Sequence, residues 1–345
     1  MINICSRNDD VKHSKIFYIF TTAMILSMPS TRAQNSEHAS SLTLKQRERL
    51  AFIDFQLYFL GELRRNDLAK RFGISSVVAT RTIAEYLAVA PNNCKLDNKK
   101  KVYRPEPGFT PWHQHSVSQA LATLTQGLAL SFEHEKSPPL PSELSPELSM
   151  PKLEILAPIS RAIHQGKVIK IRYVSTSSGE TEREAIPFAL VNNRVRWHMR
   201  AYDRKNNTFI DFVLRRITSV SILEDEPIAE DERPTSDDEW NRIINLELVP
   251  HPNLKHPEAI LLDYEMPDGV LKVSVRAANV GYLMRLWGVD CSPDYSAASK
   301  ENPEEFQLWL RDPLSIYGAP GLALAPGYAR PAASPIKTTS SDPTH

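Results

Sequence analysis

A helix-turn-helix pattern in residues 44–87 constrains the fold of this chain more than any other feature. Apolar residues recur three and four positions apart between Leu50 and Leu60, as the buried face of a helix requires. Gly61 follows directly and can end this helix, because glycine readily adopts the backbone angles of a helix end. A helix with one buried face must pack against neighbouring elements, and the next residues supply them.

Two more helices and a tight turn follow the first helix. The sequence predicts a second helix over 65–72, with Asn66 or Asp67 at its start. Gly73 permits the turn after it, and Ser75 is suited to cap a third helix with its hydroxyl. This spacing is typical of the helix-turn-helix, whose last helix enters the major groove of DNA.

A basic hairpin is expected directly after the third helix. Two short strands, 95–96 and 102–103, flank a polar turn whose tip carries three lysines at 99–101. Residues 41–110 have a net charge of +6, although the formal charge of the whole chain is zero. Such a local excess is typical of a surface that contacts phosphates, so the sequence predicts a winged helix that binds double-stranded DNA.

The third helix and the wing form the predicted DNA-binding surface. Arg81 is the one long donor of this helix face that can bond guanine at two positions. The wing lysines would contact phosphates and add affinity without specificity. Two alternatives stay open, because many winged helices bind proteins and Arg81 can be a solvated surface residue. The residues predicted to contact DNA are Ser75, Ser76, Thr80, Arg81, Lys99, Lys100 and Lys101.

A helix and a proline-rich segment are expected after the wing. Apolar residues on one face predict a helix over 112–132, which can dock on the winged helix or pair with a second subunit. Residues 136–151 contain five prolines, which no packed element tolerates. This segment therefore marks a domain boundary.

The central part of the chain has the pattern of a small β-barrel. A short helix, Ile159–His164, precedes a series of alternating strands. Turn-forming residues at 177–179 and 205–207 separate hairpin strands. A helix followed by about five short strands predicts a barrel of the Sm or SH3 type. The expected strands are 168–174, 184–187, 196–202, 209–214 and 220–223.

This central module resembles the WYL-domain family of bacterial transcriptional regulators. The motifs that carry the resemblance are Trp197-His198-Met199, Ile171-Arg172-Tyr173, Pro187-Phe188-Ala189-Leu190 and Phe212-Val213-Leu214-Arg215-Arg216-Ile217. With its flanking modules, the chain is similar over about residues 43–328 to the three-part repressors found beside phage-defence operons of the BREX and CBASS type. The resemblance implies that the barrel is a sensor for a small anionic ligand, with a nucleotide or a nucleic-acid fragment as candidates.

Strand alternation shows which residues could bind such a ligand. Trp197 shares one strand face with Met199, whereas His198 and Arg200 share the other. A polar face is too costly to bury unpaired, so it must meet solvent, a partner or a ligand. Trp197 and Tyr173 can equally be core residues, and Arg200 can form a surface ion pair. The predicted ligand-binding residues are Tyr173, Ser175, His198, Arg200 and Arg216.

Two departures from the family pattern limit what the resemblance implies about the ligand. His198 stands where the naming motif has tyrosine, and Val213 stands where many members carry arginine. Arg200 is a candidate to replace that charge. Ligand identity is therefore not transferred from other branches of the family.

An acidic segment and a third module complete the folded part. Residues 224–239 hold nine acidic residues and one arginine, which is typical of a solvated tether. A sharper hypothesis is that this segment competes with DNA for the winged helix. Beyond it, the sequence predicts a small α+β module that resembles the family's C-terminal extension, which is associated with dimer contacts or ligand response. Its expected elements are strands 259–266 and 271–277 around the turn Pro267-Asp268-Gly269, a helix over 280–287 and a strand over 305–310.

The amino terminus carries an ambiguous apolar run over 16–28. It resembles a secretory signal, but Asp9 and Asp10 lie where such a signal needs basic residues. Secretion would also be inconsistent with the DNA-binding pattern in the rest of the chain. We therefore expect a cytoplasmic protein whose native start is Met24 or Met28, with an exported interaction protein as the alternative. No stretch approaches the ~20 apolar residues that span a bilayer.

The expected fold class is α+β multi-domain, with a winged helix, a Sm/SH3-like barrel and a small α+β module. The expected division is 1–42 disordered or mis-assigned extension, 43–110 winged helix, 111–135 connecting helix, 136–152 linker, 153–226 WYL sensor, 227–256 acidic connector, 257–328 C-terminal extension and 329–345 disordered tail.

The predicted function is that of a ligand-responsive transcriptional regulator, most simply a homodimeric repressor of its own defence-associated operon. Two winged helices related by symmetry predict an inverted-repeat operator. We expect no cofactor, no metal and no catalytic residue, since no nucleophile or carboxylate pair has a supporting motif and the three cysteines are widely spaced. The alternatives are an activator or metabolic regulator of the same architecture, or a nucleic-acid-sensing adaptor without a transcriptional role.

Overall fold

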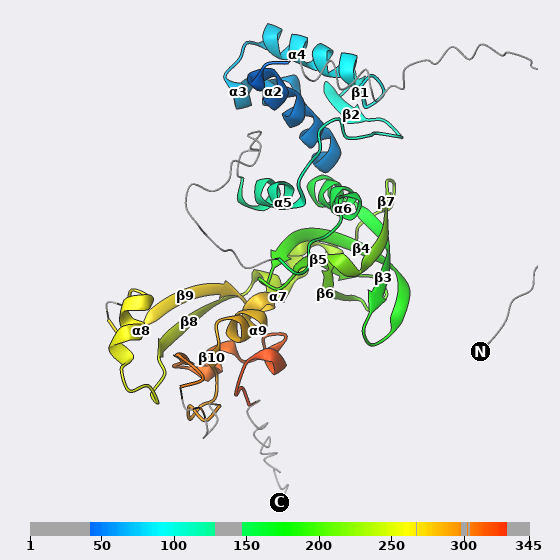
Figure 1. Cartoon of the computed structure of the whole chain (residues 1–345). Helices are drawn as coiled ribbons and strands as arrows, with labels where there is room; N and C mark the ends of the chain where they lie inside the picture. The colour runs from blue at the N-terminus through cyan, green and yellow to red at the C-terminus, as the bar shows by residue number, and fades with distance from the viewer. Residues whose placement is uncertain (1–41, 128–146, 267, 298–301, 303, 330–345) are drawn as a thin grey trace, which may run out of the picture. The chain divides into compact units, whose positions relative to one another are not determined.

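The computed structural model describes residues 42–127, 147–266, 268–297, 302 and 304–329 (Figure 1). Most of the predicted amino-terminal extension, proline-rich linker and carboxy-terminal tail lies outside the described residues. The described residues from Leu44 onward belong to one compact unit. None of their helices combines the length and the apolar character that crossing a membrane requires.

The first group of elements is a winged helix. Gly61 and Gly73 end the first two helical segments at φ values of 75° and 60°, as their positions predict. The hydroxyl of Ser75 caps the third helix by accepting a hydrogen bond from the Val78 backbone N–H at 3.3 Å. The elements are α2 (Leu44–Phe55), the π-helix η1 (Gln56–Leu60), α3 (Arg65–Phe72), α4 (Ser76–Val89), β1 (Cys94–Asp97) and β2 (Val102–Pro105).

The bounds of α3 confirm the helix predicted over 65–72, but its cap differs from the expected one. The N-cap is Arg64 rather than Asn66 or Asp67. Asp67 lies in the first turn, where its carboxylate accepts a hydrogen bond from the Arg64 backbone N–H at 3.2 Å. An acidic side chain one turn inside a helix serves the free N–H groups as well as a capping residue does.

A buried carboxylate fixes the segment that follows the wing. Asp54 on α2 accepts hydrogen bonds from the Tyr86 hydroxyl at 2.7 Å and from the Trp112 backbone N–H at 3.0 Å. His115 Nε2 lies 2.8 Å from the same carboxylate. Because these bonds hold residues 112–115 in a non-helical path, α5 (Val117–Gln126) is shorter than the helix predicted over 112–132.

Helix α6 (Leu153–Gln165) caps the end of η1 with side chains. Three side chains of α6 donate hydrogen bonds to the last backbone carbonyls of η1. The bonds run from Arg161 Nη1 to Tyr58 at 2.7 Å, from Ser160 Oγ to Phe59 at 2.8 Å and from Gln165 Nε2 to Leu60 at 3.0 Å. The last carbonyls of a helix have no partner within the helix, so these bonds satisfy groups that would otherwise be buried unpaired. The winged helix is therefore fixed to the helix that opens the next module.

The second group of elements is a five-stranded antiparallel sheet that stays open. Strand order is β6-β5-β4-β3-β7, so β6 and β7 are its two edges and no described pairing joins them. The predicted Sm/SH3-like barrel is therefore wrong. The strands are β3 (Val168–Ser175), β4 (Gly179–Asn192), β5 (Trp197–Asp203), β6 (Thr208–Val213) and β7 (Ile217–Leu223), with the 3-10 turn η2 (Leu214–Arg216) before β7.

A bulge in β4 bends this sheet without closing it. The register of β4 against β5 shifts between Pro187 and Ala189. Proline has no N–H to donate to the ladder, and bulges bend the strand that carries them. Strand β4 is also much longer than the predicted segment 184–187, because its first half pairs with β3 and its second half with β5. The sequence pattern predicted the turns between the strands, but it did not predict that β4 pairs first with β3 and then with β5.

Helix α6 covers one face of the sheet. Its buried residues, among them Leu156 and Ile159, share a core cluster with Met199 and Phe212 of the strands. The helix begins six residues before the predicted start, and Pro158 lies in its second turn without ending it. A proline near a helix start removes few hydrogen bonds, so packing on the sheet outweighs that loss.

The third group of elements is a four-stranded sheet with helices. Strand order is β10-β11-β8-β9, with β10 and β11 parallel and the other pairs antiparallel. The elements are η3 (Glu230–Glu232), η4 (Pro234–Ser236), α7 (Asp238–Asn241), β8 (Ile243–Pro250), α8 (Pro257–Asp263), β9 (Leu271–Arg276), α9 (Ala277–Leu286), β10 (Val289–Asp290), β11 (Leu308–Leu310), η5 (Pro313–Ile316) and η6 (Leu322–Leu324).

Two predictions for this region are wrong. Residues 257–263 are helical rather than part of a strand over 259–266, and Pro257 at the first helical position favours a helix. Strand β9 pairs with β8 instead of forming the predicted hairpin, whose Pro267 lies outside the described residues. Strand β8 itself falls inside 227–256, which the sequence predicted as a connector, so the C-terminal module starts earlier.

The acidic segment is not the solvated tether that its charge predicts. Glu232 is buried, and its carboxylate accepts hydrogen bonds from Arg204 Nε at 2.7 Å and Nη2 at 2.9 Å. Asp237 is also buried. The carboxylates of this segment therefore stabilise it against the sensor sheet by pairing with arginines of β5 and of the turn after it.

We predict that Ser160→Ala lowers the free energy of unfolding. The change leaves the buried Phe59 carbonyl without its partner on α6, which costs about 1–2 kcal/mol. Denaturant unfolding of the full chain measures this loss. Ser219→Ala on the exposed face of β7 is the matched control and should change stability by much less. Equal losses in the two variants would contradict the capping role of α6.

Candidate functional site

The first turns of α4 present an exposed polar face. Ser76, Thr80 and Arg81 are all exposed there, and Ser75 caps the same end. The Arg81 side chain is 82% exposed, and its Nε lies 3.2 Å from Glu85 Oε1. An exposed ion pair of this kind contributes little energy, so the Arg81 guanidinium can still reach a nucleic acid. The structure thus brings the four predicted helix residues to one surface.

Two neighbours of this surface were missed by the sequence analysis. Val77 is 79% exposed on the first turn of α4. A small apolar side chain at that position can contact the methyl group of thymine in the major groove. Arg65 on α3 donates from Nη1 to Thr80 Oγ1 at 3.4 Å, which adds a basic group to the polar face. The only sequence signal that could have identified Val77 is its apolar character on a helix face that is otherwise predicted to face solvent.

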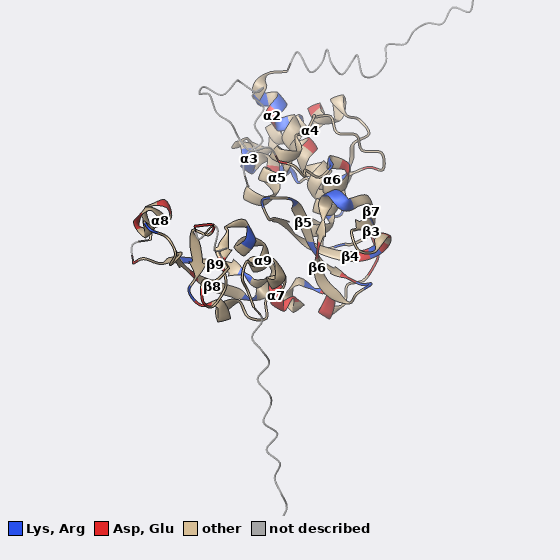
Figure 2. Ribbon diagram, turned by 60° about the horizontal axis from the view of Figure 1, so that its bottom comes forward, with Lys and Arg blue, Asp and Glu red and all other residues tan. Residues whose placement is uncertain are grey.

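The wing holds its three lysines on a fixed turn. The backbone N–H groups of Lys99 and Lys100 donate to Asp97 Oδ1 at 3.0 and 3.1 Å. These bonds, the one from Lys100 above all, hold the pKa of the Asp97 carboxyl below its usual value. Lys101 adopts a φ of 57°, which turns the chain back into β2. All three lysines are exposed, and Figure 2 shows further basic residues on α2 and α3.

Strand β5 is the centre of the sensor module. All seven of its residues are buried. Trp197 and Met199 face the core that α6 shares, so Trp197 is a core residue. His198 and Arg200, on the opposite face, are each only 3% exposed. The polar face that the sequence predicted to meet solvent, a partner or a ligand is covered by residues of this same chain.

The Arg200 guanidinium is paired with carboxylates on several sides. It bonds Asp237 in a bidentate way, from Nε to Oδ2 at 2.8 Å and from Nη2 to Oδ1 at 3.0 Å. Its Nη2 also donates to Glu239 Oε2 at 2.8 Å, and its Nη1 lies 3.5 Å from Asp211 Oδ1. Burial opposes the charge of Arg200, but these bonds raise its pKa above the usual value. Arg200 is thus already paired in this structure, and its ion pairs are buried rather than on the surface; its role as a ligand contact stays a prediction.

Burial also changes the protonation of Asp211. It raises the pKa of this carboxyl to about 6, although the neighbouring Arg200 acts in the opposite direction. We call Arg200 and its three carboxylate neighbours, Asp211, Asp237 and Glu239, the Arg200 cluster. Because three carboxyl groups face one guanidinium, the cluster carries an excess of negative charge at neutral pH.

His198 has the opposite surroundings. Its pKa is lowered to about 4, first by burial and then by the positive charges of Arg196 and Arg216. The imidazole is therefore neutral at pH 7. Backbone groups of Val191 and Arg196 act in the opposite direction and raise the pKa of the ring, but Nδ1 is buried and makes no hydrogen bond of good geometry with the described residues. Its ring stacks on Tyr282 of α9, with centroids 5.5 Å apart and planes 28° from parallel.

The other predicted ligand residues divide between the site and its periphery. Tyr173 is buried, and its hydroxyl accepts a hydrogen bond from the Val213 backbone N–H at 3.4 Å. Its hydroxyl lies close enough to Tyr282 to affect the pKa of that phenol. Ser175 instead lies at the end of β3, where its Oγ is 3.0 Å from Ser177 Oγ. The structure thus associates Tyr173, but not Ser175, with His198.

Two residues of this site were missed. Arg196 lies just before β5, two residues from His198, so strand alternation places it on the same polar face and could have identified it. Tyr282 belongs to the C-terminal module, far from β5 in the sequence, and no sequence signal connected the two.

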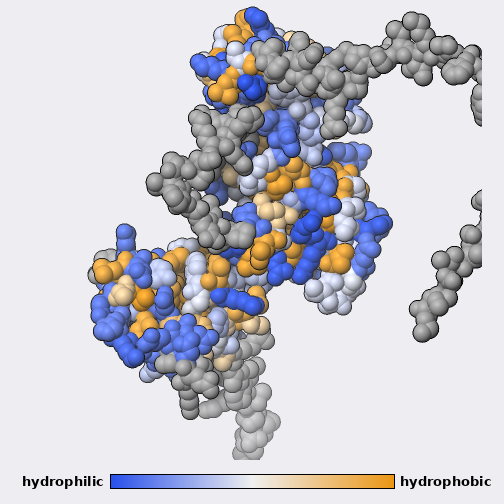
Figure 3. All heavy atoms as spheres, in the orientation of Figure 1, coloured by the Kyte–Doolittle hydropathy of each residue, from blue (hydrophilic) through white to orange (hydrophobic). Residues whose placement is uncertain are grey.

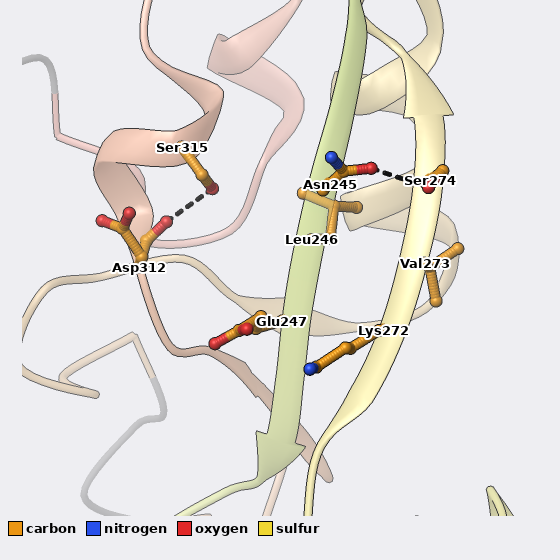
Figure 4. A pocket seen from close by; sticks show the side chains of 8 residues that line it. All are labelled: Asn245, Leu246, Glu247, Lys272, Val273, Ser274, Asp312 and Ser315. Carbon is orange, nitrogen blue, oxygen red and sulfur yellow. Dashed lines mark hydrogen bonds between the residues drawn. The ribbon is translucent and has the colours of Figure 1, made fainter.

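Two hollows lie elsewhere in the described structure. One, of about 350 Å³, is lined by residues of η1, α5, α6 and β4, including Leu60, Leu124 and Phe188. Figure 3 shows hydrophobic residues around α5 and α6 on the face that it presents. The other, of about 620 Å³, lies over β8 and β9 (Figure 4), where Ser274 Oγ donates to Asn245 Oδ1 at 2.7 Å. Neither hollow includes His198 or the arginines beside it.

The order of modules defines a class of protein: a winged helix, a helix-backed antiparallel sheet and a further α+β domain. Known protein families match each module. The matches are the winged helix-turn-helix domain of the BrxR transcriptional regulator over 45–126, the WYL domain over 154–222 and the C-terminal dimerization domain of BrxR over 243–316.

Relatives match nearly the whole folded chain. The DNA-binding transcriptional repressor CapW of Escherichia coli (strain KTE188) is 30% identical over 281 residues, which cover 79% of this chain and 91% of the relative. CapW of Pseudomonas aeruginosa is 32% identical over 298 residues, which cover 83% and 95%. The chain therefore belongs to the family of the CapW repressors, with the BrxR-type arrangement of winged helix, WYL domain and dimerization domain.

A more distant solved structure is that of the proteasome accessory factor B/C of Arthrobacter aurescens. It is 17% identical, covers 78% of this chain and 46% of its own, and has a TM-score of 0.22. Nothing below depends on a likeness that weak.

We predict that His198→Phe makes the free energy of unfolding less dependent on pH between pH 6.5 and pH 4. A histidine with a folded pKa of about 4 and an ordinary unfolded pKa of 6.5 binds its proton only after unfolding. The unfolding free energy should therefore fall by about 3 kcal/mol as pH drops from 6.5 to 4 because of this group. Urea unfolding across this range measures the slope.

The variant keeps the ring stack but cannot titrate, so its slope should be smaller by that amount. Asp211 contributes a slope of opposite sign in the same range, and the comparison of the two proteins cancels it. The matched control is His164→Gln at an exposed position on α6, which should leave the slope unchanged. Identical profiles for wild type and His198→Phe would contradict the neutral buried state.

Proposed function

We propose that this protein is a homodimeric, DNA-binding transcriptional repressor that responds to an anionic ligand and controls its own defence-associated operon. The observation that carries the proposal is the exposed face of α4 beside a wing with three exposed lysines. The membership in the CapW family supports a repressor over the alternatives. Such a protein acts where the chromosome is, in the bacterial cytoplasm.

The proposed DNA contacts follow from the exposed groups. The N-terminal half of α4 enters the major groove, where Arg81 reads guanine and Ser76 and Thr80 contact base edges or phosphates. Ser75 leaves its backbone N–H at the positive end of the helix, which suits a phosphate. The wing lysines bind phosphates along the flanking backbone.

The proposed homodimer rests on the dimerization-domain match and on affinity. One winged helix neutralises few phosphates, so a single copy binds weakly at physiological salt. Two copies joined by their C-terminal domains add their contacts and place two recognition helices on one operator. A two-fold symmetric dimer fits an inverted repeat.

The proposed ligand site is the polar face of β5 around His198. Arg216 supplies positive charge, and Tyr173 and His198 supply hydrogen-bonding groups next to it. This chemistry suits a small anion, including a nucleotide or a short nucleic-acid fragment. The ligand releases DNA only if it binds the DNA-incompetent state more tightly than the other state.

The test of the function is binding to the DNA immediately upstream of the protein's own gene. Gel shifts of the full chain should give a tight complex, and footprinting should protect two half-sites related by inverted symmetry. Random DNA of equal length should bind at least ~10³-fold more weakly at physiological salt. Equal affinity for both DNAs would exclude a specific repressor.

We predict that the triple change Lys99→Gln, Lys100→Gln, Lys101→Gln flattens the salt dependence of DNA binding. Each lost phosphate contact removes about 0.9 from the slope of log K against log salt concentration, so the slope should fall by up to about 3 per chain. Fluorescence anisotropy at several salt concentrations measures it. The equivalent change at Lys205, Lys255 and Lys272 is the control, and an unchanged slope in the wing variant would remove the wing from the interface.

We predict that Arg81→Ala weakens operator binding by about 1–3 kcal/mol and relaxes base preference at one position of each half-site. Glu85→Ala is the matched control, because it removes the ion-pair partner and frees Arg81. It should leave affinity unchanged or increase it slightly. Arg81 would be a phosphate contact, and not a base reader, if Arg81→Ala weakened binding to operator and random DNA equally.

A further inference from the structure

We propose that Arg196 and Tyr282 complete the anion site of the sensor, so that the C-terminal domain contacts the bound ligand directly. This inference rests on the proposed ligand-responsive function and assigns to it two residues that lie outside the predicted set. Arg196 precedes β5, and Tyr282 lies on α9 of the domain that matches the dimerization family.

The first argument is unbalanced positive charge. Arg196 and Arg216 are both half-buried, and neither has a carboxylate partner among the described residues. By contrast, the neighbouring Arg183, Arg200 and Arg204 each pair with at least one carboxylate. Partly buried cations without partners are costly, and here both act on the same neutral histidine. An anion between them would remove that cost.

The second argument is an unsatisfied buried nitrogen. Only 3% of His198 is exposed, and its Nδ1 has no hydrogen-bond partner in the described structure. A buried polar atom without a partner costs free energy, so native proteins rarely retain one. In the tautomer protonated at Nδ1, the imidazole donates to an anion oxygen. His198 thus offers a donor within electrostatic reach of both arginines.

The third argument places Tyr282 beside His198. Its ring stacks on His198, and its pKa is raised first by burial and then by Asp211, while Arg196 and Arg200 lower it. Tyr282 is therefore within electrostatic reach of the positive pair and of the Arg200 cluster. Tyr282 covers the face of the imidazole, so a ligand bonded to Nδ1 in the ring plane lies next to the edge of this stack.

The Arg200 cluster limits where the anion can lie. Three carboxyl groups surround one guanidinium there, so an incoming anion is repelled from Arg200 and attracted to Arg196 and Arg216. Two of these carboxylates, Asp237 and Glu239, belong to the segment between the sensor and the C-terminal sheet. The same segment is held by Arg276 at the start of α9, whose Nη1 donates to the Trp240 carbonyl at 2.6 Å.

The backbone beside Tyr282 is packed against another part of its domain. Its neighbour Gly281 packs so closely on the backbone of Gly321 that a side chain has no room there. A displacement of the Tyr282 backbone therefore has to move α9 together with the segment around Gly321. Anion binding is in this way converted into a change at the dimerization domain, without an intermediate element.

The test uses isothermal titration of the full-length protein with inorganic pyrophosphate, and operator binding with and without pyrophosphate. Arg196→Gln and Arg216→Gln should each weaken pyrophosphate binding ~10- to 100-fold, since each removes a charge-assisted bond. Arg215→Gln, an exposed neighbour, is the control and should change it less than about twofold. Tyr282→Ala should abolish the effect of pyrophosphate on operator affinity, whereas Tyr317→Ala, an exposed tyrosine of the same domain, should not.

The outcomes separate this inference from the proposed function. If Arg216→Gln weakens binding but Arg196→Gln and Tyr282→Ala behave as wild type, the inference is overturned and the sensor role stands. If wild type binds no pyrophosphate, both the sensor role and the inference fail, while DNA binding is unaffected. Tyr282→Phe retains the ring and its packing, so it tests the phenol contact even if Tyr282→Ala does not fold. Full coupling in both Tyr282 variants would overturn the direct contact.

Discussion

The burial of β5 on both faces is the constraint on which the rest of the structure depends. A strand in the middle of an antiparallel sheet commonly has one wet face, and its sequence then alternates. Here the second face carries His198 and Arg200, which cannot be buried without partners. The acidic segment and β6 supply those partners for Arg200. Helix α9 covers His198 with the ring of Tyr282, and His198 Nδ1 has no hydrogen-bond partner in the described structure.

The same sheet connects the sensor to both outer modules. On one face, α6 packs in the core cluster and its side chains cap the helical segment η1 of the winged helix. On the other face, Asp237 and Tyr282 attach the C-terminal module. Packed interiors resist continuous deformation. The proposed ligand response would therefore act through these contacts on whole elements rather than on single side chains.

The winged helix followed from sequence because its determinants are local. Gly73, Ser75 and the apolar spacing of α2 act within a few residues of themselves, so the turn and the cap need no contact with distant residues to form. The predicted barrel failed because strand alternation gives the faces of a strand but not its partners. Residues 259–266 failed because a short apolar run suits a strand or a helix, and Pro257 decided for the helix.

By itself, the sequence determined the class of protein, the winged helix and the motifs of the WYL domain, since each is a short pattern of residue types. Only the tertiary structure decided what those residues do. It paired Arg200 with Asp237, which charge counting had assigned to a solvated tether, and it brought Tyr282 onto His198. The physical reason is that electrostatic and stacking energies depend on distances between residues remote in the chain, and folding alone sets those distances.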